Sequence, residues 1–155
     1  MKKIHSIIPA IVAFTFLLAD SAGAEALYLG QDPPESEPLV FAPGTVSTEV
    51  VTEYCMAFTP DGREIYFSRA HSGIMMCALE NGEWTSPEKA PFGEKYPGGE
   101  VHITPDGKRL LMNRFKGLAE GEAGGVYILS KKDGEWSDPV LVVENGMRAT
   151  STARG

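Results

Sequence analysis

A carboxylate and an imidazole stand two residues apart in this sequence, at Glu100 and His102. In a β-strand, residues i and i+2 project from the same face. The two side chains could therefore ligate a metal together or act as a general acid and base. Two ligands alone are too few to form a metal site, so we predict that the chain binds no metal. We favour a hydrogen-bonded pair, and we keep both residues as binding candidates.

Several common catalytic and ligand-binding motifs are absent from the sequence. It contains no G-x-S-x-G nucleophile elbow, no Walker-type or dinucleotide-binding glycine pattern and no H-E-x-x-H zinc motif, and it lacks calcium-loop spacing. The formal net charge is −7 and the Lys and Arg residues do not cluster. Such a composition argues against nucleic acid and anionic membranes as partners. No catalytic residue and no cofactor are predicted.

The chain has two cysteines, Cys55 and Cys77. The strands predicted below place a third strand between them, beyond the Cα separation that a disulfide requires. We therefore expect two free thiols.

The candidate residues lie within an internal repeat, which shows what must position them. The stretch FTPDGREIYF, at 58–67, returns 45 residues later as ITPDGKRLLM, and NGEWTSP, at 81–87, returns as DGEWSDP. Each copy predicts four short antiparallel strands, which is the pattern of a β-propeller blade. No helical apolar period occurs outside the N-terminal segment. The sequence therefore predicts an all-β chain with two complete blades of a larger propeller, for which we expect six blades.

The repeated Pro-Asp-Gly predicts a tight turn between two strands. Proline presets φ, aspartate bonds the nearby backbone, and glycine adopts positive φ. A residue that every blade requires is structural first, so we assign a structural role to Pro60, Asp61, Gly62, Pro105, Asp106 and Gly107. Asn-Gly and Asp-Gly, at 81–82 and 133–134, predict further hairpin turns.

Aromatic residues offer two further candidate sites. Trp84 and Trp136 could stack on sugars, but their equivalent positions favour packing between strands. The second copy carries seven additional residues within 115–124. Insertions of this kind form loops on one face, where binding often occurs. Phe115 and Lys116 are therefore binding candidates, although a tolerated surface loop is the interpretation that we favour.

The N-terminus predicts export. Lys2 and Lys3 precede an apolar run over residues 7–18, and an A-x-A pattern ends at Ala24. This is typical of a signal peptide cut after Ala24, and the run is too short to span a bilayer. A retained anchor is the alternative. We expect a periplasmic or secreted chain that does not insert into the membrane after cleavage.

The repeat boundaries divide the chain into six segments. These are a signal peptide (1–24), a polar Pro-rich lead-in (25–36), an orphan strand that closes the last blade (37–48), blade one (49–92), blade two (93–144) and the truncated start of a third blade (145–155). We therefore expect a fragment of a longer propeller. Two blades expose open edges, which missing blades or self-association would have to cover.

The stretches FTPDGREIYFSR and ITPDGKRLLMNR resemble the WD-repeat-like propeller motif of exported bacterial TolB-type proteins. The resemblance covers residues 27–155 and implies a propeller fold in a chain longer than this one. The sequence departs from the motif at Ala153-Arg154, where Pro-Asp is expected. The added N-terminal domain of TolB is not visible here, so its partners are not carried over.

Two classes of function remain. The first, which we favour, is a non-enzymatic scaffold in the cell envelope that binds a protein, peptide or glycan. The alternative is a fragment of a carbohydrate-active hydrolase or lyase whose channel is lined by acids or histidines. Binding is favoured because the sequence offers many turn residues and no convergent acid–base or metal set.

Overall fold

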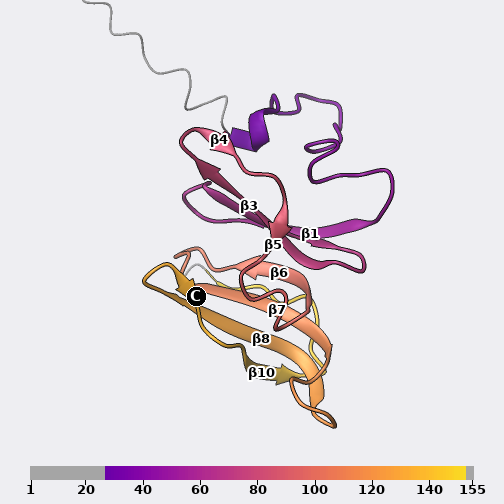
Figure 1. Cartoon of the computed structure of the whole chain (residues 1–155), viewed down its shortest axis with the longest axis vertical. Coiled ribbons are helices and arrows are strands. Elements are labelled where there is room, and N and C mark those ends of the chain that lie inside the picture. The colour runs from indigo at the N-terminus through magenta and orange to yellow at the C-terminus, as the bar shows by residue number, and fades with distance from the viewer. Residues whose placement is uncertain (1–26, 153–155) are drawn as a thin grey trace, which may run out of the picture.

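The computed structural model describes residues 27–152, so the predicted signal peptide (1–24) and residues 153–155 lie outside its described part. The described chain contains ten strands and one short 3-10 helix, η1 (Leu27–Gly30). The strands form two antiparallel sheets that stack on each other (Figure 1). The all-β prediction is confirmed. Within residues 27–152, no helix is long and apolar enough to span a membrane.

Both sheets are meanders with the same strand order. The first contains β1 (Glu53–Phe58), β2 (Glu64–Arg69), β3 (Gly73–Glu80), β4 (Glu83–Trp84) and β5 (Glu88–Lys89). The second contains β6 (Gly99–Ile103), β7 (Arg109–Lys116), β8 (Ala123–Lys132), β9 (Glu135–Trp136) and β10 (Val140–Glu144).

In each sheet the predicted fourth strand is split into two pieces. Strands β4 and β5 both pair with β3, and β9 and β10 both pair with β8. A proline lies between the two pieces, at Pro87 and Pro139, and proline cannot donate to a ladder. Each sheet is therefore consistent with one four-stranded propeller blade.

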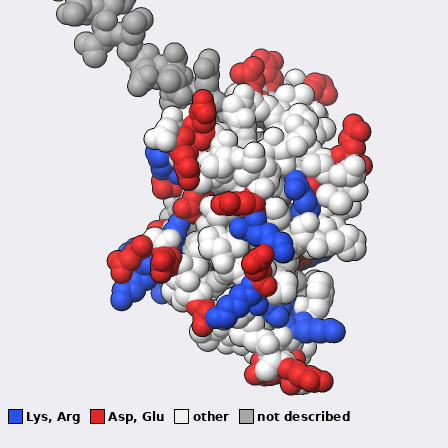
Figure 2. Space-filling model, in the orientation of Figure 1, with Lys and Arg blue, Asp and Glu red and all other residues white. Residues whose placement is uncertain are grey.

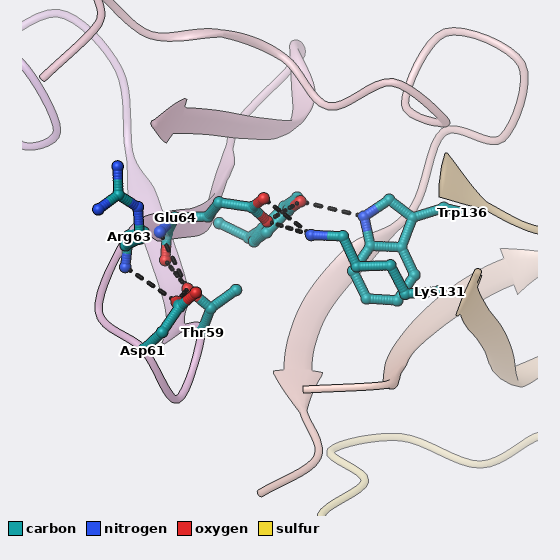
Figure 3. Close-up of polar contacts among 7 residues, drawn as sticks. Thr59, Asp61, Arg63, Glu64, Lys131 and Trp136 are labelled. Carbon is teal, nitrogen blue, oxygen red and sulfur yellow. Dashed lines mark hydrogen bonds and ion pairs between the residues drawn. The ribbon is translucent and has the colours of Figure 1, made fainter. Parts of the chain in front are cut away.

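The first hairpin of each sheet is built by the Thr-Pro-Asp-Gly turn. Thr59 Oγ donates to Asp61 Oδ1 at 2.6 Å and accepts from the backbone N–H of Glu64 at 2.9 Å, as Figure 3 shows. The N–H of Gly62 donates to the Thr59 carbonyl at 2.8 Å, and Gly62 has φ 69°. The equivalent residues of the second sheet make the same bonds. The turn therefore depends on its threonine as much as on Pro-Asp-Gly.

Strand β2 of the first sheet is buried on both faces. Because successive strand residues point to opposite faces, Tyr66 packs toward the second sheet, whereas Ile65 and Phe67 pack on the other side. There they meet Ala42 and Val46, which come from the segment that precedes β1. Burying one such large apolar side chain contributes roughly 1.5–3 kcal/mol. This burial on both faces explains why β2 has three consecutive apolar residues, at 65–67.

Residues 37–48, expected to supply a closing strand, form no strand in the described chain. Their ladder contact is an isolated parallel bridge between Pro43 and Ser47. The segment turns at Ala42, whose carbonyl accepts from the N–H groups of Thr45 and Val46 at 3.1 and 2.9 Å. It lies on the first sheet as a covering turn. Closure of a last blade by this segment stays a prediction.

Candidate functional site

The first strand of each sheet carries a β-bulge at the same repeat position. The register shifts between Tyr54 and Met56 in β1 and between Gly99 and Val101 in β6. The residues left out of the ladder are Cys55, with φ 48°, and Glu100, with φ 29°. Positive φ is uncommon for residues other than glycine, and a bulge redirects its side chain.

Arg148, which follows β10, also has a positive φ at a matching place in the chain. This residue has φ 53° and precedes Thr152 by four residues, as Cys55 precedes Thr59 and Glu100 precedes Thr104. The three side chains line one cavity of about 200 Å³, together with His102, Asn113 and neighbouring residues. We call this cavity the inner pocket. Its thiol, carboxylate and guanidinium come from equivalent positions of three successive repeats.

Glu100 and His102 line the same pocket, but in the described chain they do not bond to each other as the favoured hydrogen-bonded pair would. Both side chains instead bind the segment that follows β10. Glu100 Oε2 accepts from the backbone N–H of Arg148 at 3.0 Å, and Oε1 lies 3.4 Å from Arg148 Nε. The N–H of Ser151 donates to His102 Nε2 at 3.1 Å, and Ser151 Oγ lies 2.8 Å from the same nitrogen. Because Nε2 accepts, a neutral His102 carries its proton on Nδ1.

The two cysteines lie on β1 and β3, with β2 between them, and neither is in a disulfide. Partial burial, together with the Glu100 carboxylate, raises the pKa of the Cys55 thiol. Burial raises the pKa of Cys77 to about 11. The thiolate is the nucleophilic form, so neither side chain is an activated nucleophile at neutral pH. Within residues 27–152, no group of three or more His, Cys, Asp or Glu is placed to hold a metal ion.

A second cavity, of about 280 Å³, is lined in part by Tyr54 and Gly99, which directly precede Cys55 and Glu100 in the chain. We call it the arginine groove. Its lining is Tyr54, Arg69, His71, Gly73, Pro97, Gly98, Gly99, Arg114 and Phe115. The Phe115 side chain, from the start of the insertion, is 79% exposed. Lys116 is exposed at the end of β7 and is not part of this lining.

The insertion extends the β7–β8 hairpin, in which Lys116 pairs with Ala123. Arg114 holds its base, because Nε and Nη2 donate to the carbonyls of Lys116 and Gly117 at 3.3 and 3.2 Å. Sequence reasoning did not name Tyr54, Arg69, Arg114 or Arg148 as binding candidates, although all four line these cavities. The available signals were the matched arginines of the two repeats and the constant spacing from Arg148 to Thr152.

Trp136 packs between the two sheets. Its Nε1 donates to Tyr66 Oη at 3.0 Å, and its ring meets those of Tyr66 and Phe92 at centroid distances of 6.2 Å. Lys131 Nζ lies 5.2 Å from the centre of the indole (Figure 3). Trp84 packs on the cluster that contains Ala42. Both side chains are half-buried in packing contacts.

The face of the molecule in Figure 2 shows acidic and basic side chains interspersed. No protein-family model and no curated protein matches the chain. Among solved structures, a protein from Bacteroides uniformis, provisionally named a 6-phosphogluconolactonase, is similar at 20% identity and a TM-score of 0.33. The match covers 53% of this chain and 24% of that chain, so it spans about a quarter of the neighbour's length. At this similarity it carries no argument about activity or blade number.

Proposed function

We propose that the chain is an exported, TolB-type β-propeller repeat protein that acts as a non-enzymatic binding scaffold in the cell envelope. The main support is the inner pocket. Its three equivalent positions, two in β-bulges and one after β10, all have positive φ but present Cys55, Glu100 and Arg148. The aspartate of the turn, a structural position, is the same residue in the two complete repeats, Asp61 and Asp106. A position that keeps its backbone and changes its side chain suits recognition of an asymmetric ligand.

The polar contacts of the pocket favour binding over acid–base catalysis. A general base needs a lone pair that faces the substrate. His102 Nε2 already accepts from the Ser151 backbone, and both Glu100 oxygens face Arg148. The alternative, a carbohydrate-active enzyme, draws on one observation, which is that Glu100 and His102 line the same cavity.

The test combines binding and turnover. The purified chain is applied to glycan and peptide arrays, and the same preparation is assayed for hydrolysis or elimination on a panel of chromogenic glycosides. Wild type should bind a defined set of array ligands without turnover. Glu100→Gln should lose that binding, whereas Glu80→Gln, an exposed residue at the end of β3, should keep it. Turnover that Glu100→Gln or His102→Gln abolishes would establish the enzyme instead, and an array without any bound ligand would also refute the proposal.

A further inference from the structure

The arginine groove differs in charge from the other cavities of the described chain. It is lined by two arginines and a histidine and by no carboxylate. Four other cavities each include at least one acidic side chain in their lining. In a chain with a formal net charge of −7, a groove of this composition favours an anion.

The two arginines of the groove occupy the same repeat position but have different partners. Arg69 Nε lies 3.0 Å from Glu53 Oε1. Burial alone would raise the pKa of Glu53, but hydrogen bonds from Thr48 and Arg69 outweigh it and hold the pKa below its ordinary value. The residue that corresponds to Glu53 in the second repeat is Gly98. The first arginine is therefore neutralised by the chain, and the second has no acid at the equivalent place.

No side chain can fill the place at position 98 without a backbone shift. A Cβ added to Gly98 would lie 2.9 Å from the carbonyl oxygen of Asn113 and 3.1 Å from the Met112 sulfur. The close approach of the two strands thus requires glycine there, and it leaves the space next to Arg114 without a carboxylate.

The protein contacts of Arg114 are neutral. Nε and Nη2 donate to backbone carbonyls, and Nη1 is buried without a hydrogen-bond partner in the described chain. Arginine–carboxylate bonds are charge-assisted and roughly twice as strong as bonds between neutral groups. A carboxylate beside this guanidinium would therefore be favoured over water or another carbonyl.

We propose that the arginine groove binds the carboxylate of a small ligand with an apolar body. Arg114 supplies the positive charge that pairs with this carboxylate, as Arg69 pairs with Glu53. The exposed Phe115 and the Tyr54 ring contact the apolar body. This inference rests on the proposed binding function and assigns a ligand class to the arginine groove.

The test compares an acid with its uncharged isostere on the full chain. 3-Phenylpropionate and 3-phenylpropanamide are titrated by NMR at low ionic strength. Because a charge-assisted bond is stronger than a bond between neutral groups, the acid should bind at least about tenfold more tightly than the amide, a difference of about 1.4 kcal/mol. Equal affinity of the two compounds, or no binding of the acid, would overturn the proposal. This comparison needs no variant.

Two variants locate the site. Arg114→Gln should abolish the preference for the acid, whereas Arg109→Gln, an exposed arginine on the same strand that is not among the groove-lining residues, should preserve it. Unfolding midpoints of both variants verify that the fold is kept. An equal loss in both variants, or none in Arg114→Gln, contradicts the assignment. If array ligands bind through Glu100 but acid and amide do not differ, this inference fails while the proposed function stands.

Discussion

Substitution of Lys131 by methionine should weaken the contact between the two sheets. Lys131 Nζ lies 2.8 Å from both carboxylate oxygens of Glu64, and the two side chains are only 21% and 26% exposed. Tyr66 Oη donates to Glu64 Oε2 at 2.8 Å. Methionine preserves the apolar stem that packs on the Trp136 ring but removes the ammonium group. Glu64 then keeps the hydrogen bond from Tyr66 and loses the one from Lys131.

The magnitude follows from the exposure of the pair. Exposed ion pairs contribute about 0–1 kcal/mol, and breaking a fully buried pair costs about 3–5 kcal/mol. A pair between these limits should lower the free energy of unfolding by about 2 kcal/mol when only Lys131 is changed. Glu64→Gln removes the other charge. The double variant should lose less than the sum of the two single losses, with a coupling energy of about 1–2 kcal/mol.

Urea denaturation of the wild type, the two single variants and the double variant measures this coupling. Trp136 fluorescence is a suitable probe because its ring lies beside Lys131 and Tyr66. Tyr127→Phe is a matched control, since the Tyr127 hydroxyl bonds only the Ala123 carbonyl of its own strand. A coupling energy below about 0.5 kcal/mol would refute the reasoning, because it would make the pair equivalent to an exposed one.

Three further predictions concern pH, thiol reactivity and export. The hydrogen bond from the Thr59 hydroxyl is the main cause that holds the pKa of Asp61 below its ordinary value. The ionised carboxylate therefore stabilises the fold fully at any pH above the ordinary pKa, near 4. This contribution is lost as the pH falls through the lowered pKa of the folded state. Asp61→Asn should therefore flatten the fall of the urea midpoint from pH 5 to pH 2, and an unchanged slope would contradict this. Iodoacetamide should label the exposed Cys55 before the buried Cys77, and mass spectrometry of peptides tests the order; faster labelling of Cys77 would be inconsistent with the fold. Protein secreted from the full sequence should begin at Glu25 on N-terminal sequencing, and an uncut N-terminus would favour the anchor.

The hairpins were predictable because their signals are local. Asn81-Gly82 and Asp133-Gly134 form turns with positive φ at both residues, as that dipeptide type requires. The duplicated order of turn and apolar run likewise predicted the order of strands in both sheets. The fourth strand was predictable only in outline, because where pairing stops beside Pro87 and Pro139 depends on the neighbouring strand.

The N-terminal cover and the candidate site could not be derived from local signals. Residues 37–48 have the composition of a strand, yet ladder partners decide whether a strand forms. The two bulges and the positive φ at Arg148 could not be predicted, because Cys, Glu and Arg are not residue types that favour positive φ. Arg114 lacks the acidic partner that Arg69 has because position 98, 16 residues earlier, is a glycine. This relation can be recognised only when the pairing of β6 with β7 is known.

The bulges also have a consequence for engineering. A residue other than glycine in a left-handed conformation costs on the order of 1 kcal/mol. Glycine at 55, 100 or 148 would relieve this cost, yet it would remove the thiol, the carboxylate or the guanidinium from the inner pocket. Exchanges among side chains that are not β-branched should keep this cost similar or lower it, because asparagine, aspartate and histidine tolerate positive φ better and β-branched residues worst. These positions are therefore suited to a combinatorial library, in which pocket chemistry varies while the two sheets keep their register.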